Sequence, residues 1–532
     1  MKSKNKFFTI LILTGLLLVV NGCNEDKLDL SNPNTVAEPE FFQNNADFRL
    51  AVNGMYHPIT AVLFWGRVIH TGALLRSDAF NIVPFQQNTT MSTLEGQPGI
   101  ARWSSDMFPQ LYQTIFRANT IIEKINETNV PSETDRNEIL GQAYFMRAFA
   151  NWYLANLWGN VPLVMKVPKT REDFFPQPSN QAAINEAIVN DLTEAFNRLP
   201  NSWPDAEKGR PTAGSALALR GKTHLYMKDY PNAVADLRAV TTDFSYALLP
   251  ASRYEQNFTE ENENNEESVF ELQYLGQDNF IWGTDIPGTG TQGHYLIDYS
   301  PPELSPDNGH FINPHILQVF EDNGDTVRRN ATIAFDYPGA TGYGGVPFTE
   351  DFAADIAVAN TITDPMGNVG VPALFTKKYA GFEQGMRAEI PVLGQTIGNN
   401  WRIIRYADVL LMLAEALNEN MATAEAIPFI NQVRERSGIA PLALTLDKAA
   451  VEQAIIDERI MELTGEGHRF FDLVRWGIAE DVLGAGSTIA AGRHPKSLAG
   501  PTAVFTVGQD ELIWIPVPEL QANPNLRPNP GY

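Results

Sequence analysis

The sequence predicts a mainly α fold in which helix pairs form a scaffold, with a long irregular central insertion and a few short strands. Apolar residues recur at intervals of three and four, which is typical of amphipathic helices, in several stretches of residues 46–244 and of residues 401–532, although residues 63–90 follow no single period. This period is lost between residues 245 and 400. Within that insertion, the alternation in VFELQYL, residues 269–275, indicates one short strand.

Residues 1–22 have the organisation of a signal peptide. Three lysines precede an uncharged apolar run over residues 7–20, which is shorter than the ~20 apolar residues that a transmembrane helix needs. The run ends in VNGC, which is similar to a bacterial lipobox, although Asn21 is an unusual occupant of that motif. We therefore expect Cys23 to be lipidated, so that the protein is tethered to a membrane without spanning it.

Cys23 is the only cysteine in the chain, so an intramolecular disulfide and a thiolate metal cluster are both excluded. Residues 23–45 are polar, contain Pro33 and Pro39, and are predicted to form an extended tether to the helical body. A short helix is expected directly after it, over residues 46–56, with Phe48 on its apolar face.

The charge of the chain disfavours a nucleic-acid partner. Its 39 Lys and Arg residues against 63 Asp and Glu residues give a formal net charge of −24, spread along the sequence. Such a surface repels polyanions at long range. A local basic patch can still oppose the net field, so charged ligands are not excluded.

A repeat signal occurs at residues 183–199 and 213–227, two helical patterns separated by a Pro-rich turn. Gly221 and Ala233 fall at tetratricopeptide-like spacing, where small residues let antiparallel helices approach closely. Arg220 stands where such repeats usually have leucine. A second pair, residues 403–417 and 424–433, repeats the scheme, and stacked helix pairs of this kind often present binding surfaces. Elsewhere, three aromatic residues are expected to pack in the helical core: Trp152, Tyr153 and Trp158.

The segment DERIMELTGEGHRFFDLVRWG, residues 457–477, is dense in both apolar and charged residues. Gly465 and Gly467 are expected to end its first helix. If the segment is buried, its charges must pair, because an isolated buried ion is very costly. Glu466, His468 and Asp472 resemble a catalytic set, but charges at helical spacing are more typical of an ion-pair network.

This segment, followed by IPVPELQANPNLRPNPGY at the C-terminus, is similar to the signature of SusD/RagB-type lipoproteins. QAYFMRAFANWYLANLWGNVPLV and RYADVLLMLAEALNE also resemble blocks of that family. The resemblance implies one body over residues 46–532: a helical part (46–244), a loop-rich insertion (245–400) and a second helical part (401–532). It also implies an outer-membrane lipoprotein that faces the medium, binds a glycan and hands it to a SusC-like TonB-dependent porin. Asn24, Glu25 and Asp26 resemble the export signal of related lipoproteins.

The resemblance places glycan contacts in the loops after the first helix and in the central insertion. Trp65 lies beside Gly66, which would leave an indole face uncovered in a surface loop, and Asp78 lies in a turn where relatives often place an acid. Trp282 is expected either to be buried in the neighbouring core or to be exposed as a stacking surface for a ligand. The remaining candidates are aromatic residues among Gly, Thr, Asp and Gln: Phe280, Tyr295 and Tyr343.

Aromatic rings and amide or carboxylate side chains suit a neutral sugar, which has an apolar C–H face and a rim of hydroxyls. Binding of this kind requires no catalytic residue, metal or cofactor. The expected ligand is a neutral β-glucan such as laminarin, with an α-glucan such as starch as the alternative. A glycoside hydrolase and a protein-binding adaptor are the competing interpretations. The 63 acidic residues always offer a suitable carboxylate pair, so they do not identify a hydrolase. HExxH, GxSxG, GxxxxGK[ST] and paired CxxC motifs are all absent from the sequence.

Overall fold

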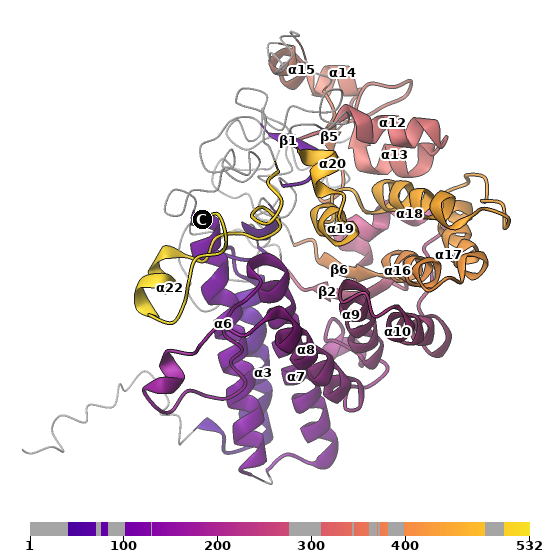
Figure 1. Cartoon of the computed structure of the whole chain (residues 1–532). Helices are drawn as coiled ribbons and strands as arrows, with labels where there is room; N and C mark the ends of the chain where they lie inside the picture. Colours follow the sequence, from indigo (N-terminus) through magenta and orange to yellow (C-terminus); the bar gives the residue numbers. More distant parts are fainter. Residues whose placement is uncertain are drawn as a thin grey trace, which may run out of the picture.

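The computed structural model describes most of the chain as helical, with two small sheets (Figure 1). Among the described residues, no helix combines the length and apolar character that crossing a bilayer requires. The description covers residues 41–66, 68–70, 76–82, 102–128, 130–275, 310–342, 345–360, 370, 373–380, 398–484 and 505–532.

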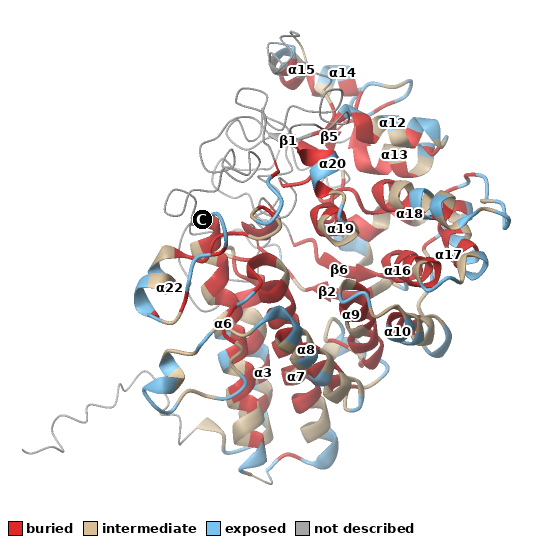
Figure 2. Ribbon diagram, in the orientation of Figure 1, coloured by how far each residue is buried: buried red, intermediate tan, exposed pale blue. Residues whose placement is uncertain are grey.

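Four helices of the N-terminal part pack side by side (Figure 1): α3 (Asn45–Thr60), α6 (Arg102–Asn126), α7 (Glu133–Trp158) and α8 (Gln181–Phe196). Helix α3 begins at a capping box, in which the Asn44 side chain accepts a hydrogen bond from the Asp47 N–H. It runs past the predicted end at residue 56, and its last turn buries Pro58 and Ile59. The predicted apolar stripes face the core between the helices (Figure 2).

Two helix pairs share one design. Each of the four helices has 14 residues, and each pair is joined by a short turn in which Lys228 or Met421 has a positive φ, 60° and 61°. A Cβ added at Gly221 would lie 2.7 Å from Leu237 Cγ, so glycine permits the close helix contact. The predicted tetratricopeptide-like pairing is confirmed. The pairs are α9 (Ala213–Tyr226) with α10 (Tyr230–Asp243), and α16 (Tyr406–Glu419) with α17 (Thr423–Arg436).

Arg220 departs from the repeat pattern for a physical reason. Its guanidinium donates to Asp236 of α10 through Nε (2.7 Å) and Nη2 (2.6 Å). An ion pair therefore replaces the apolar contact that leucine would make between the two helices.

The central insertion contains short helices, although its sequence has no helical periodicity that would predict them. They have three to nine residues, too few for a period of 3.6 to be detected in a sequence window. Several of their apolar residues, such as Ile316, Phe320 and Phe348, are nevertheless buried. The helices are α12 (Pro314–Asp322), α13 (Thr326–Thr332), α14 (Phe348–Asp351) and α15 (Ala353–Ala359), together with the 3₁₀ helices η4 (Ala251–Phe258) and η5 (Glu260–Asn262).

Strands from distant parts of the chain form the two sheets. The predicted strand is confirmed as β2 (Ser268–Leu272), which pairs antiparallel with β6 (Trp401–Arg405) and aligns Leu272 with Trp401. The second sheet has the order β1-β3-β5-β4, with antiparallel neighbours. Its strands are β1 (Phe80–Ile82), β3 (His310–Ile312), β5 (Phe375–Thr376) and β4 (Ile333–Ala334).

The charged segment 457–477 forms α18 (Lys448–Leu463) and α19 (Arg469–Trp476), separated by Gly465 and Gly467 at positive φ. Glu462 is fully buried and accepts hydrogen bonds from Arg405 (2.9 Å) and Arg436 (2.5 Å). The prediction that these charges pair is confirmed. Two further short helices follow along the chain: α20 (Ala479–Leu483) and α22 (Val517–Ala522).

The C-terminal segment packs on the N-terminal helices (Figure 1). Asn529 Nδ2 donates to the carbonyl of Trp158 (3.1 Å), and Trp158 Nε1 donates to the carbonyl of Trp514 (3.1 Å). Trp152, Tyr153 and Trp158 are all buried, as predicted.

Candidate functional site

Trp65 does not have the open indole face that the sequence predicts. Its side chain is 5% exposed, and its ring lies 5.7 Å from the rings of both Tyr153 and Trp401. The reason is the turn after α3. A Cβ at Gly66 would lie 2.9 Å from the backbone of Ala61, so glycine allows the tight turn that folds Trp65 into the core.

Asp78 is also buried rather than available to a ligand. Its carboxylate accepts two hydrogen bonds from Arg469 (2.8 and 2.9 Å) and lies 3.1 Å from His315 Nε2. Burial alone would raise the pKa of Asp78, but Arg469 and His315 outweigh it and hold that pKa well below its usual value. The expectation of a ligand contact is corrected: Asp78 is an internal ion-pair partner.

The predicted lipidation site Cys23 and the aromatic candidates Phe280, Trp282, Tyr295 and Tyr343 lie outside the described residues. Near Tyr343, an isolated antiparallel bridge joins Thr341 to Pro347.

The three residues that resemble a catalytic set belong to the buried ion-pair network. Glu466 pairs with Lys378 (2.8 Å) and Arg405 (2.7 Å), and Asp472 accepts hydrogen bonds from Arg459 (2.8 Å). Burial, together with nearby Lys222, lowers the pKa of His468 to about 3. These contacts support the ion-pair interpretation over the catalytic one. No group of three acidic, His or Cys side chains suited to a metal ion occurs within the described ranges.

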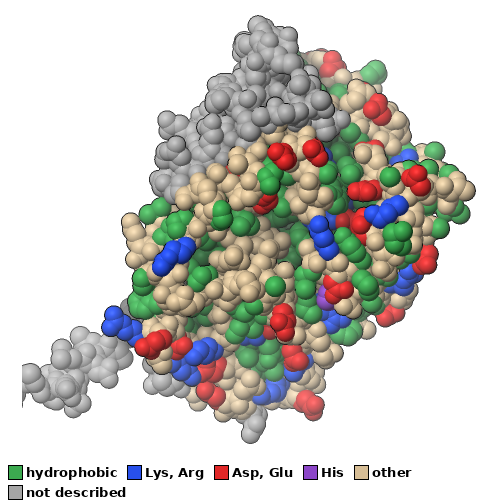
Figure 3. All heavy atoms as spheres, viewed as in Figure 1, with side chains coloured by type: hydrophobic (Ala, Val, Ile, Leu, Met, Phe, Trp, Pro, Cys, Tyr) green, Lys and Arg blue, Asp and Glu red, His purple; other side chains and the backbone are tan. Residues whose placement is uncertain are grey.

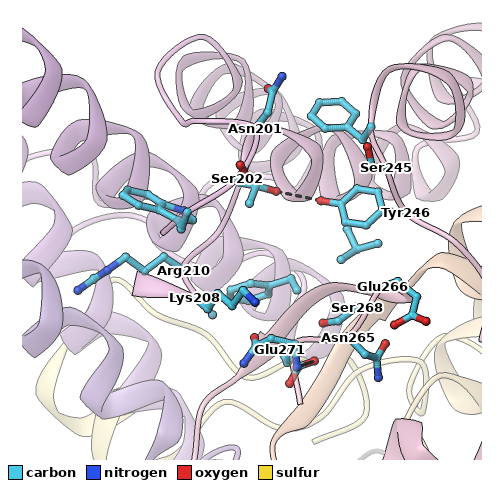
Figure 4. A pocket seen from close by; sticks show the side chains of 17 residues that line it. Asn201, Ser202, Lys208, Arg210, Ser245, Tyr246, Asn265, Glu266, Ser268 and Glu271 are labelled. Carbon is cyan, nitrogen blue, oxygen red and sulfur yellow. Dashed lines mark hydrogen bonds between the residues drawn. The ribbon is translucent and has the colours of Figure 1, made fainter. Parts of the chain in front are cut away.

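A surface pocket of about 250 Å³ lies where the α8–α9 connection meets strand β2 (Figure 4). We call it the β2 pocket. Asn201 and Ser202 form one wall, Ser245 and Tyr246 of the segment after α10 form a second, and Ser268 and Glu271 lie across from them (Figure 4). The complete lining is residues 201–203, 208–210, 212, 244–246, 264–266 and 268–271.

Four aromatic side chains line the β2 pocket: Phe244 and Tyr246 are half-buried, and Trp203 and Phe270 are buried. Trp203 Nε1 donates to the carbonyl of Pro211 (2.8 Å), which fixes the indole. The rings of Phe244 and Tyr246 are stacked, with centroids 6.1 Å apart and planes at 25°. Tyr246 Oη lies 2.9 Å from Thr212 Oγ1, so its polar tip already has a partner (Figure 4). The pocket therefore has rigid apolar surface.

Polar side chains surround this apolar surface. Within the described part of the chain, the exposed side chains of Asn201, Ser202 and Ser245 make no hydrogen bond, so their donors and acceptors are available to a ligand. The charged lining residues balance: Lys208 and Arg210 against Glu266 and Glu271.

A second pocket, of about 270 Å³, is also lined by the 206–210 turn. We call it the α3 pocket, because Asn53, Tyr56, His57 and Thr60 of α3 line it, together with residues 206–210 and 271–273. Lys208, Gly209, Arg210 and Glu271 line both pockets, so the two are neighbours.

These two pockets are not predicted by the sequence patterns. One sequence feature does point to the β2 pocket. Trp203, in the stretch NSWPDAEKGRP, is surrounded by polar residues, Pro and Gly, as are the aromatic candidates of the central insertion. Phe244 and Tyr246 carried no comparable signal, because their pocket exists only when three separate segments meet.

Helix pairs that carry loops define a helical scaffold protein, here with an aromatic and polar surface pocket. The particular family follows from sequence comparison. A family model described as "SusD family" matches residues 266–532, and one described as "Starch-binding associating with outer membrane" matches residues 77–225. The chain belongs to the SusD family. Carbohydrate binding and outer-membrane association are the properties by which these families are described.

Individual relatives match over nearly their whole length. The chain is 28% identical to SusD-like protein P2 of Formosa agariphila, over 97% of this chain and 98% of the relative. A SusD superfamily protein from Bacteroides vulgatus has a similar structure, with a TM-score of 0.75 at 26% identity, covering 92% of this chain and 100% of that one. A laminarin-binding SusD-like protein has the same fold, with a TM-score of 0.71 at 24% identity, over 92% and 100% of the two chains.

Proposed function

We propose that this protein is a lipid-anchored, outward-facing protein of the outer membrane that captures a neutral polysaccharide and delivers it, uncleaved, to a SusC-like TonB-dependent transporter. The observation that carries the proposal is the SusD-family match over residues 266–532. The anchor at Cys23 rests on the apolar run and lipobox-like motif that precede it.

The proposed ligand is a β-glucan of the laminarin type. The net charge of −24 favours a neutral polymer over a sulfated or uronic one. On the face shown in Figure 3, acidic and basic side chains are interspersed, without one basic field to attract a polyanion. The laminarin-binding protein of the same fold supports this choice. Starch is the alternative, supported by the description of the family model over residues 77–225.

The proposed contacts in the insertion are its aromatic residues, Phe280, Trp282, Tyr295 and Tyr343. Trp65 and Asp78 are not included, because both are packed in the core. A stacking ring on a loop gives affinity without any reactive group, as a capture protein requires.

Native electrophoresis through gels containing laminarin, starch or a uronic polymer tests this function. We expect laminarin to retard the wild-type protein and Trp282→Ala to weaken the retardation. Free mobility in every gel would refute glycan capture and favour the protein-binding adaptor. Thin-layer chromatography of laminarin after overnight incubation tests the hydrolase alternative, because new products would show cleavage.

A further inference from the structure

We propose that the β2 pocket and the α3 pocket together form a second glycan subsite for a neutral hexose chain, separate from the aromatic residues of the insertion. The inference rests on the proposed function, since it assigns a further surface to the same class of ligand. The geometry, hydrogen bonds and charges of the residues that line the two pockets support this subsite.

The turn between the two pockets is held in place before any ligand binds. Arg210 Nη1 donates to Gln142 Oε1 (3.0 Å) and Nη2 donates to Asn53 Oδ1 (2.9 Å), which ties the turn to α7 and α3. Gly209 has a φ of 92°, and a Cβ there would overlap the Gln273 side chain at 2.3 Å. The turn is therefore fixed, and because the two pockets share these lining residues, one extended ligand can contact both.

The chemistry of the β2 pocket matches a sugar ring. Phe244 and Tyr246 offer half-buried apolar surface, with the buried rings of Trp203 and Phe270 beside them. The indole N–H and the tyrosine hydroxyl already have protein partners, so they do not compete for a ligand. The uncommitted side chains at the rim can donate to and accept from hydroxyls. A volume of about 250 Å³ holds roughly eight waters at about 30 Å³ each, so a hexose ring can displace several.

Two observations argue against other ligands. The lining carries two basic and two acidic side chains, Lys208 and Arg210 against Glu266 and Glu271, so it does not select an anion. A peptide that binds as an added strand beside β2 is also disfavoured, because carbonyl groups of β2 already accept hydrogen bonds from side chains. The Val269 carbonyl accepts from Ser215 Oγ (2.6 Å), and the Glu271 carbonyl accepts from Gln273 Nε2 (3.1 Å).

The test uses the purified protein and laminarihexaose, with maltoheptaose in parallel, by isothermal titration calorimetry. Phe244→Ala removes part of the aromatic surface, and Ser245→Trp places bulk at an exposed position of the rim. Phe174→Ala is the matched control, because Phe174 is 63% exposed and lines neither pocket. We expect each pocket variant to lose about tenfold in affinity or to lose one class of sites, with the control unchanged.

Hydrogen exchange gives a second readout. Laminarihexaose should slow amide exchange in residues 201–210 and 244–271 of the wild type, but not of Ser245→Trp. Wild-type binding that both pocket variants retain in full, without protection of these segments, would overturn the subsite and leave the proposed function intact. Failure of the wild type to bind either oligosaccharide would instead refute the proposed function, and the subsite with it. Ser245 is exposed, so Ser245→Trp is expected to fold. This variant therefore still tests the subsite if Phe244→Ala does not fold.

Discussion

A single carboxylate, Asp78, links the segment after α3 to α12 and α19 through His315 and Arg469. Replacement by asparagine keeps the shape but leaves Arg469 buried without an anion. We expect Asp78→Asn to lower the free energy of unfolding by about 3–5 kcal/mol, measured by urea denaturation. The control is Asp205→Asn, which alters an exposed carboxylate paired with Lys208 and should behave like the wild type. Equal stability of the two variants would contradict the structural role of Asp78.

The raised pKa of Glu263 predicts that the stability of the fold depends on pH. Burial raises its pKa from 4.5 to about 7, and its carboxylate accepts a hydrogen bond from the Asn400 N–H (2.7 Å). Between these two pH values the folded state binds more protons than the unfolded state, so this group lowers stability as the pH rises through that window. Glu263→Gln removes the effect and keeps the acceptor. The Tm difference between variant and wild type should therefore shift in favour of the variant from pH 5 to pH 8.

Differential scanning calorimetry across that range measures the shift, with the exposed Glu261→Gln as the control. A difference that stays constant with pH would show that Glu263 does not titrate in this window.

At the scale of elements, the turns of the two helix pairs contain a testable strain. Met421 has a φ of 61°, in the left-handed region that is unfavourable for a residue with a Cβ. Its side chain is 80% exposed, so packing offsets little of this backbone strain. We expect Met421→Gly to raise the free energy of unfolding by about 0.5–1 kcal/mol. Met227→Gly is the matched control, since Met227 has a φ of −75° and glycine there should destabilise. Chemical denaturation compares them, and destabilisation by both would show that the left-handed turn is not strained.

The prediction for the whole molecule concerns its anchor. Cys23→Ala should move the protein from the membrane fraction to the soluble fraction of the expressing cell, because lipid attachment requires the thiol. Fractionation and immunoblotting measure this, with Asn24→Ala as the neighbouring control. Purified Cys23→Ala protein should retain its laminarin retardation, because the tether is distant in sequence from every proposed glycan contact. A variant that remained in the membrane fraction would refute lipid anchoring at this residue.

The sequence by itself determined the helix pairs and the need for ion pairing in residues 457–477. Helical periodicity is a local property, and so is the density of charge in an apolar segment. The partners of those charges were not predictable, because Arg405 and Lys378 come from distant segments and meet Glu466 only in the folded core.

Tertiary structure alone decided which of the described aromatic residues line a pocket. Trp65 has the sequence surroundings of an exposed indole, but the turn at Gly66 places it against Trp401, far along the chain. Trp203 has similar surroundings and lines a pocket, because the segment after α10 and strand β2 leave a space beside it. Sequence describes what a side chain can bind, whereas exposure depends on which distant segments cover it, and only the packed structure contains that information.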